Sequence, residues 1–427
     1  MISISNFVYY FKKYIKETSL KKILHIMILL PSLLLASFNG KIIDSKTLVP
    51  LSNVIVSDSK HSVKTDKNGS FSIISKEKLY HVKAYGYRRL SFNSDRNNTL
   101  IKVEPITVKA LYLTYWGAHN DSKTMRNLLH LLDTTEANAV VMDVKNEYGS
   151  ISFLTPLKQH NSYGAQKTRT NRNIQKFMKR MKDRNVYTIA RIVTFKDEIQ
   201  ASHNPSYAIR RDDNGSIWRN DDNMAWVDPF DKRAQEYTID VAVEAAKVGF
   251  DEINFDYLRF PAKSGLRFCQ PNTQKNRIQA LGQFLDRAQN RLRKYGVFIS
   301  VDTYGNICWS KDDNNIGQTV EGLAAHADYL APMLYPSGFS SGSFNFKYPS
   351  NHPYAVIYRS ISNIKTRIDT KRVRPWLQYF KDYTKARRHY RKFEVREQMR
   401  GAKNINANGW LLWSPSSKYH AEYFNKK

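Results

Sequence analysis

The stretch DEINFDYLRF at residues 251–260 is the strand from which the fold of this chain can be read. The period of two in a β-strand places Glu252, Asn254 and Asp256 on one face of it. Amphipathic helical patterns stand on either side, at residues 232–247 and 274–294. Strands that alternate with helices in this way predict βα units and a parallel sheet.

Seven further short strands continue this alternation from residue 106 onward. They are expected at residues 110–116, 139–145, 186–195, 297–305, 328–336, 373–380 and 409–415, with further helices at 173–183 and 393–403. A doubly wound sheet would carry a glycine-rich phosphate loop after its first strand, where this chain has Tyr115-Trp116-Gly117-Ala118. Eight strands without that loop predict an α/β fold of the (β/α)8 TIM-barrel type over residues 105–427.

Residues 39–104 differ in character, because short β-prone runs are separated there by polar turns such as residues 66–69. They predict a small all-β sandwich of antiparallel strands that ends near Glu104 and Pro105. The arrangement GKIID … PLSNVIV … TDKNGSFSI … YGY resembles the carboxypeptidase regulatory-like domain. The resemblance implies a β-sandwich without catalytic residues, used as a spacer or an attachment module.

The first 38 residues have the pattern of an export segment. An apolar run of 16 residues, 23–38, follows five lysines, as in the positive and apolar regions of a secretory signal. A cleaved signal with its cleavage site at Ala36 and Ser37 is expected, and an uncleaved amino-terminal anchor is the alternative. Either form predicts an exported protein, which is periplasmic, at the cell surface or secreted.

The composition describes a folded and strongly basic chain. With 41% hydrophobic and 13% aromatic residues, the sequence excludes a disordered protein. The formal net charge is +29, and its densest runs, residues 176–184 and 385–400, alternate with apolar residues as solvated helix faces do. The excess is compatible with an anionic glycan or an anionic membrane surface as partner, whereas a nucleic acid is disfavoured because no recognition motif accompanies the charge.

Carboxylates at the ends of the predicted strands are the candidate catalytic groups. In TIM barrels the chemistry lies at the carboxyl ends of the strands, which selects Asp143, Asp256 and Asp302 and leaves Asp251 and Asp328 as structural residues at strand starts. No His or Cys cluster of metal-site type accompanies them, so no metal and no cofactor are expected. Two carboxyl groups about 5 to 9.5 Å apart are the usual requirement for glycosidic bond cleavage. The alternative for each carboxylate is a salt bridge to Arg191 or Arg259, or a loop cap.

Aromatic and basic residues near the same strand ends are the candidate sugar-binding groups. All seven tryptophans lie in the barrel region, and three of them follow or end predicted strands, whereas Trp376 and Trp410 are expected in the core. The candidate substrate-binding residues are Trp116, Arg191, Tyr257, Arg259, Tyr304, Trp309, Tyr335 and Trp413.

The motifs VVMDVKNEYG, GFDEINFDYLRFP, ISVDTYG, ADYLAPMLYPSGF, RPWLQYF and GWLLWSP together resemble the family known as the putative glycoside hydrolase domain, over about residues 107–425. The resemblance implies a TIM barrel related to polysaccharide-degrading enzymes, and it implicates Asp143, Glu252, Asp256 and Asp302. Family members tend to carry an acid where this chain has Tyr379. If that acid serves catalysis, the activity is weakened here or Asp382 replaces it.

The leading hypothesis is an exported glycoside hydrolase of a cell-envelope or extracellular polysaccharide. Asp256 is its nucleophile or base, Asp302 its general acid, and Asp143 and Arg191 orient them. A non-catalytic glycan-binding or envelope-scaffolding barrel is the alternative, and a nucleic-acid or anionic-lipid binder is a weaker third. The sugar, the linkage, the anomeric outcome and the oligomeric state stay open.

The only two cysteines, Cys269 and Cys308, follow the fourth and fifth strands in adjacent loops. Two cysteines exclude a disulfide scaffold and a four-thiolate zinc site. Since an exported protein meets an oxidising compartment, a disulfide between them is expected, with two free thiols as the alternative.

Overall fold

The computed structural model describes residues 37–94 and 99–427 of the chain. The predicted signal or anchor segment lies outside the described residues except for its last two, Ser37 and Phe38. Ser37 already begins the first strand of the structure, and Phe38 is buried in the core of the amino-terminal module. None of the helices in the described part of the chain has both the length and the apolar character of a membrane span.

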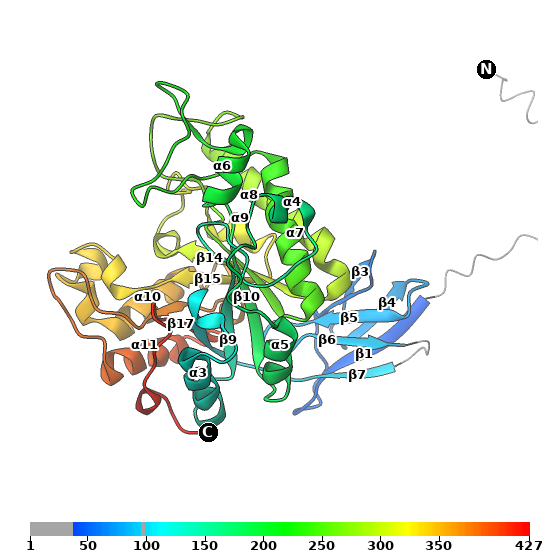
Figure 1. The fold of residues 1–427 in the computed structure, drawn as a ribbon. Coiled ribbons are helices and arrows are strands. Elements are labelled where there is room, and N and C mark those ends of the chain that lie inside the picture. Colours follow the sequence, from blue (N-terminus) through cyan, green and yellow to red (C-terminus); the bar gives the residue numbers. More distant parts are fainter. Residues whose placement is uncertain (1–36, 95–98) are drawn as a thin grey trace, which may run out of the picture.

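The larger part of the molecule is a closed barrel of eight parallel strands surrounded by helices (Figure 1). The strands follow one another around the barrel in chain order. Seven of them lie within the stretches predicted from the sequence, and the first strand begins two residues before its predicted stretch. They are β8 (Val108–Leu113), β9 (Ala139–Lys145), β10 (Tyr187–Val193), β12 (Glu252–Asp256), β14 (Phe298–Tyr304), β15 (Tyr329–Met333), β16 (Trp376–Gln378) and β17 (Gly409–Trp413). The (β/α)8 TIM barrel is therefore confirmed.

Helices connect these strands, and most of the longer ones begin at a polar residue whose side chain caps the first turn. Asp231 and Thr273 do so for the two helices that flank β12, each accepting from backbone N–H groups. The α-helices are α3 (Lys123–Thr134), α4 (Lys158–Ser162), α5 (Ile174–Lys182), α6 (Glu198–His203), α7 (Lys232–Val248), α8 (Gln274–Leu292), α9 (Val320–Ala324), α10 (Pro353–Ile364) and α11 (Lys392–Asn404). A short two-stranded sheet, β11 (Arg210–Arg211) and β13 (Leu266–Arg267), joins two loops outside the barrel.

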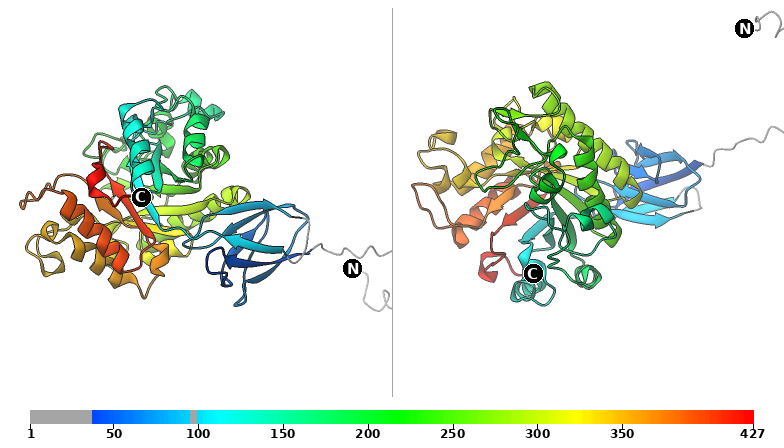
Figure 2. Two further views of the ribbon diagram at one scale, coloured as in Figure 1. Left: turned by 90° about the horizontal axis from the view of Figure 1, so that it is seen from below. Right: turned by 45° about the horizontal axis from the view of Figure 1, so that its top comes forward.

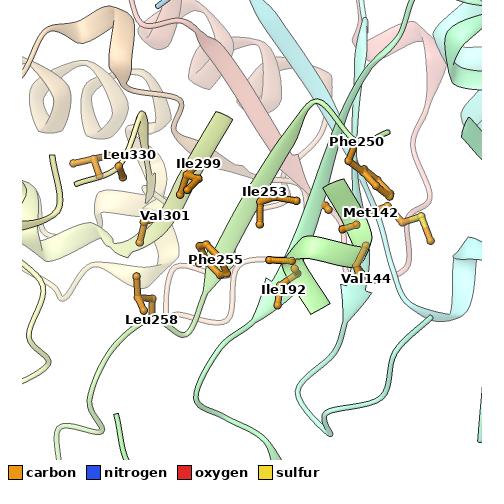
Figure 3. Close-up of a cluster of buried hydrophobic side chains, with 14 of the residues drawn as sticks. Met142, Val144, Ile192, Phe250, Ile253, Phe255, Leu258, Ile299, Val301 and Leu330 are labelled. Atoms are coloured by element: carbon orange, nitrogen blue, oxygen red, sulfur yellow. The ribbon is translucent and has the colours of Figure 1, made fainter. Parts of the chain in front are cut away.

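Strand β12 shows how the alternation of residues builds both the core and the site. Gly249, at φ +107°, ends α7 in the left-handed conformation that glycine adopts easily, and the chain then enters the strand. Ile253 and Phe255 point outward into the hydrophobic cluster between the strands and the helices (Figure 3). The intervening residues, Asn254 and Asp256, therefore face the inside of the barrel.

The amino-terminal module consists of two small sheets with an apolar core between them. One sheet has the order β4-β1-β7 and the other β3-β2-β5-β6. The strands are β1 (Ser37–Asp44), β2 (Ile55–Ser57), β3 (Ser62–Lys64), β4 (Ser70–Ile74), β5 (Leu79–Lys83), β6 (Leu90–Asn93) and β7 (Thr99–Val103). The antiparallel prediction is wrong at one place, because β7 runs parallel to β1 before the chain enters the barrel.

This module docks beside the amino-terminal ends of the barrel strands (Figure 2). Lys83 bonds Asp328 at 2.7 Å and Arg89 bonds Asp251 at 3.0 Å. Both aspartates also accept backbone N–H groups, from Ile299 and Thr188 respectively. Asp251 and Asp328 thus have the structural role expected of residues at strand starts.

The disulfide expected between Cys269 and Cys308 is not formed, and both residues are free thiols. Cys308 is buried in the hydrophobic core of the barrel, in a short 3-10 helix that follows β14. Cys269 is exposed, and its backbone N–H donates to Asp228 at 2.6 Å. Adjacent loops do not imply that their side chains face each other, since one thiol here points into the core and the other does not.

We expect Phe255→Ala to lower the free energy of unfolding by about 3–5 kcal/mol, because it empties a fully buried site between strands and helices. Phe393→Ala is the matched control, since the same side chain is 63% exposed there on α11, and it should cost less than about 0.5 kcal/mol. Chemical denaturation of both variants measures the difference. Equal effects would contradict the assignment of Phe255 to the core.

Candidate active site

The candidate site is organised by a buried arginine inside the barrel. Arg191, on β10, is 1% exposed. Its Nη1 bonds Asp143 at 2.5 Å, and its Nε and Nη2 bond Asp256 at 3.0 and 2.5 Å. Glu147 and Asp302 lie at 3.2 and 3.9 Å from the same guanidinium. The three predicted aspartates therefore converge at the carboxyl ends of β9, β12 and β14.

The two main candidates, Asp256 and Asp302, are close enough to act on one bond. Asp256 Oδ2 lies 3.0 Å and Asp302 Oδ2 lies 3.9 Å from the same atom, Arg191 Nε, so the two oxygens are at most 6.9 Å apart. This limit falls within the range over which two-carboxylate catalysis operates, about 5 to 9.5 Å.

Asp302 stands in an environment that favours its protonated form. It is fully buried, and its Oδ1 accepts from Asn254 Nδ2 at 2.8 Å and Trp376 Nε1 at 2.6 Å, both neutral donors. Burial and, after it, the negative charge of Asp256 raise the pKa of Asp302 well above its ordinary value. Asp256 instead lies directly against the Arg191 guanidinium, so its negative charge is compensated.

The turn after β12 presents Asp256. Tyr257 has φ +50°, a left-handed conformation that is uncommon for a residue with a side chain. Its backbone N–H donates to Asp256 Oδ1 at 2.6 Å, and its ring packs edge-on against Trp226. Such a backbone conformation next to a cluster of charged groups is typical of functional sites.

Asp143 lies behind this pair rather than beside it. It accepts from Tyr112 Oη at 2.5 Å and from the backbone N–H of Tyr115 at 3.2 Å, in addition to Arg191. Burial outweighs these contacts and raises the pKa of Asp143 to about 6. Asp143 does not line the cavity described next, so its position suits the orientation of Arg191 rather than contact with a substrate.

A cavity of about 290 Å³ opens above Asp256 and Asp302. Its lining is mostly aromatic and basic, with three carboxyl groups. The lining residues are Glu147, Arg191, Asp256, Tyr257, Arg259, Asp302, Tyr304, Met333, Tyr335, Trp376 and Trp413. Six of the eight residues predicted to bind substrate are among them: Arg191, Tyr257, Arg259, Tyr304, Tyr335 and Trp413.

Trp116 and Trp309 do not line this cavity. Trp116 is 71% exposed in the 3-10 helix Trp116–Ala118 after β8. Trp309 donates its indole N–H to Ser360 at 3.0 Å and packs edge-on against Phe344. Both follow strand ends, as predicted, but the loops carry their rings away from the carboxylates.

Of the four predicted catalytic residues, Glu252 is the one that pairs with a different arginine and lies outside the site. It is fully buried, forms an ion pair with Arg374, and accepts from Tyr187 Oη at 2.7 Å. It does not line the cavity, because four residues of extended strand separate it from Asp256 by about 13 Å. Glu252 therefore belongs to a lower layer of the barrel interior.

Tyr379, where the resemblance leads us to expect an acid in relatives, also lies outside the cavity. The Tyr379 hydroxyl accepts the backbone N–H of His420, and its ring packs on Tyr419 and Tyr423. Asp382 is buried in a loop, where it accepts the backbone N–H groups of Thr384 and Arg388. Neither residue is placed to replace Asp256 or Asp302.

Three residues of the site are not predicted from the sequence. Trp376 is expected only in the core, but it lines the cavity and its indole N–H donates to Asp302. Asn254 shares the inner face of β12 with Asp256, which was the available signal for its contact with Asp302. Glu147 follows β9 in the motif DVKNEYG, yet nothing in its sequence position reveals that it reaches Arg191.

Two further features of the described residues help to locate the site. A larger cavity, about 860 Å³, lies at the other end of the barrel beside the amino-terminal module, lined by Tyr87, Ile106 and Gly409 among others. In a TIM barrel the amino-terminal ends of the strands serve stability and the carboxyl ends carry the chemistry. The smaller cavity, at the carboxyl ends, is therefore the candidate active site. Within the described ranges no group of three or more His, Cys, Asp and Glu side chains is arranged as a metal site.

A solved structure shares this fold. The glycoside hydrolase domain of PgaB (BpsB) from Bordetella bronchiseptica superposes with a TM-score of 0.55 and 13% identity, over 73% of this chain and 95% of that chain. A class V chitininase from Pseudomonas fluorescens Pf-5 gives a TM-score of 0.47 and 12% identity, over 74% and 97%.

At the level of sequence, a hypothetical protein from Ruminiclostridium thermocellum ATCC 27405 is 34% identical over 45% of this chain and 96% of that chain, with a TM-score of 0.41. No curated protein matches the sequence. The profile of one protein family matches residues 110–419, which is most of the chain and all but the first two residues of the barrel strands. The chain therefore belongs to the family described as "Putative glycosyl hydrolase domain".

Proposed function

We propose that this protein hydrolyses glycosidic bonds of a cell-envelope or extracellular polysaccharide in the cavity above Asp256 and Asp302. The observation that carries the proposal is the pairing of these two carboxyl groups, at most 6.9 Å apart, in contrasting environments. One lies against a guanidinium and the other is fully buried among neutral donors. Pairs of carboxyl groups whose environments favour different protonation states divide the roles of acid and base.

In this mechanism Asp302 is the general acid and Asp256 the nucleophile. Asp302 gives its proton to the oxygen of the leaving sugar while an Asp256 oxygen bonds to the anomeric carbon. Water then attacks that carbon, gives a proton back to Asp302, and releases Asp256. The limit of 6.9 Å includes the whole range of retaining enzymes, about 5–5.5 Å, and only the lower edge of the inverting range, about 6.5–9.5 Å, so it favours retention.

Arg191 is the positioning residue of this mechanism. It holds Asp256 through two nitrogens and is itself held by Asp143 and Glu147. Its guanidinium also lies 5.0 Å from the centre of the Trp413 ring, which stacks on Tyr112 with 3.9 Å between ring centres. The rings of Trp413, Tyr257 and Tyr335 line the cavity and offer flat surfaces to a sugar.

The proposed location rests on the sequence. The apolar run at residues 23–38 behind five lysines supports export, by a cleaved signal or an uncleaved anchor. The amino-terminal module, which resembles the carboxypeptidase regulatory-like domain, is proposed as a spacer or attachment module. It contacts the barrel at the amino-terminal ends of the strands, so its own strands do not cover the cavity at the carboxyl ends.

We expect Asp256→Asn to keep the fold and to reduce hydrolysis of a susceptible glycan by at least about a hundredfold, because the amide cannot act as nucleophile or base. Asp183→Asn is the matched control, since the same change occurs there on an exposed side chain beside α5. Turnover of a glycan panel and circular dichroism of both variants provide the measurement. Wild-type turnover in Asp256→Asn would defeat the assignment of Asp256, whereas binding without turnover by the unaltered protein would leave a non-catalytic glycan-binding barrel.

The pH profile tests the role of Asp302. Its acid form is lost as pH rises through its raised pKa, so activity should fall on the alkaline side. Trp376→Phe removes an N–H donor that lowers the pKa of Asp302, so the alkaline limb should move to higher pH. A hydrogen bond to a charged group is worth about 1.5 kcal/mol or more, which corresponds to about one pH unit.

The control for this shift is Trp410→Phe, a tryptophan of the outer core that does not contact Asp302. Its pH profile should keep the limbs of the unaltered enzyme, even if its stability falls. An alkaline limb that stays in place in Trp376→Phe, or moves to lower pH, would contradict the assignment of Asp302 as the acid.

A further inference from the structure

Arg259 is a cation of the cavity lining that forms no ion pair with an acidic side chain of the described residues. It follows β12, three residues beyond Asp256, and lines the same cavity. Its Nη1 donates to the backbone carbonyl of Phe260 at 3.2 Å. Among the described residues, no carboxylate lies within the 4.0 Å of an ion pair with its guanidinium.

The contrast with Arg191 shows that this arrangement differs from a structural arginine. Arg191 is surrounded by Asp143, Asp256 and Glu147, which together satisfy its charge. Arg259 instead lies over aromatic rings, 5.0 Å from the centre of Trp226 and 5.3 Å from that of Tyr257. The rings hold the guanidinium in place without neutralising it, and its remaining N–H groups are left for another partner.

The carboxyl groups of the cavity lining form no ion pair with Arg259. The lining carboxylates Asp256 and Glu147 both pair with Arg191, and burial raises the pKa of Asp302 well above its ordinary value. A half-buried cation without a counter-ion is costly to keep, since burial weakens its hydration. A substrate that brings its own negative charge would offset that cost on binding.

We propose that Arg259 binds an anionic substituent of the substrate, a carboxylate or a sulfate or phosphate ester on a sugar, so that the enzyme acts on an acidic polysaccharide. This inference rests on the function proposed above and specifies its substrate class. The planar fork of a guanidinium matches these anions with two parallel hydrogen bonds. The net charge of +29 would also attract a polyanion to the protein.

The test compares acidic polymers with neutral counterparts of the same backbone. The probes are a uronic-acid polymer with its carboxyl-reduced form, and a sulfated and a phosphorylated polymer each with its ester-free form. The unaltered protein should prefer the acidic member of one pair by about 10- to 100-fold in kcat/KM, the expected effect of hydrogen bonds to a charged group. The pair that shows the preference identifies the anion.

Arg259→Gln should bring this ratio close to one, and Arg259→Lys should retain part of it. The matched control is Arg267→Gln, which removes a charge from the exposed strand β13 in the same loop, outside the cavity lining, and should leave the ratio unchanged. A ratio near one in the unaltered protein would overturn the inference. So would an equal loss on acidic and neutral polymers in Arg259→Gln, which would make Arg259 a positioning residue for Asp256.

Binding measurements separate this inference from the proposed function. Asp256→Asn, with and without Arg259→Gln, is titrated calorimetrically with oligosaccharides from the same pairs. If no polymer is hydrolysed, the proposed function fails, yet an acidic-over-neutral binding ratio that depends on Arg259 still supports the anion site. If hydrolysis occurs without any charge preference in either assay, the anion site alone fails.

Discussion

The burial of Arg191 is the constraint on which the site depends. A guanidinium inside a barrel is stable only if its charge is compensated, and the partners must come from the strands beside it. Asp143 from β9 and Asp256 from β12 provide the close contacts, and Glu147 completes them from the loop after β9. The pairing of β10 with β9 places Arg191 opposite Asp143. The register of this pairing shifts directly after Arg191, and such β-bulges are common beside active sites. The same contacts that stabilise the arginine therefore gather the carboxylates.

This arrangement also makes the two candidate catalytic groups unequal. Asp256 and Asp302 are separated by one inter-strand step, but only Asp256 has direct hydrogen bonds to the guanidinium. Burial and the negative charge of Asp256 raise the pKa of Asp302, and these effects outweigh the hydrogen bonds from Trp376 and Asn254, which lower it. Trp376 comes from β16, two strands further around the barrel than β14, so the closure of the sheet brings this donor to Asp302.

The local pattern along a strand predicts which side chains share a face, but it does not predict their tertiary partners. Period two along β12 correctly placed Glu252, Asn254 and Asp256 on one face, whereas the family resemblance implicated Glu252 in catalysis, and that residue pairs instead with Arg374 in a lower layer. The ends of neighbouring strands were correctly expected to converge. The direction in which a loop carries its side chains was not, and this is why Trp116, Trp309 and the predicted disulfide between Cys269 and Cys308 differ from expectation.

From the sequence alone, the alternation of strands and helices determined the barrel, and the rule for strand ends selected Asp143, Asp256 and Asp302. Each strand and helix in these inferences is recognised from a local pattern of residues along the chain. Only the tertiary structure decided the partners of these acids, since Arg191 meets Asp256 and Trp376 meets Asp302 across 65 and 74 residues of sequence. Protonation and charge compensation depend on such distant neighbours, because burial and Coulomb interactions act through space and not along the chain.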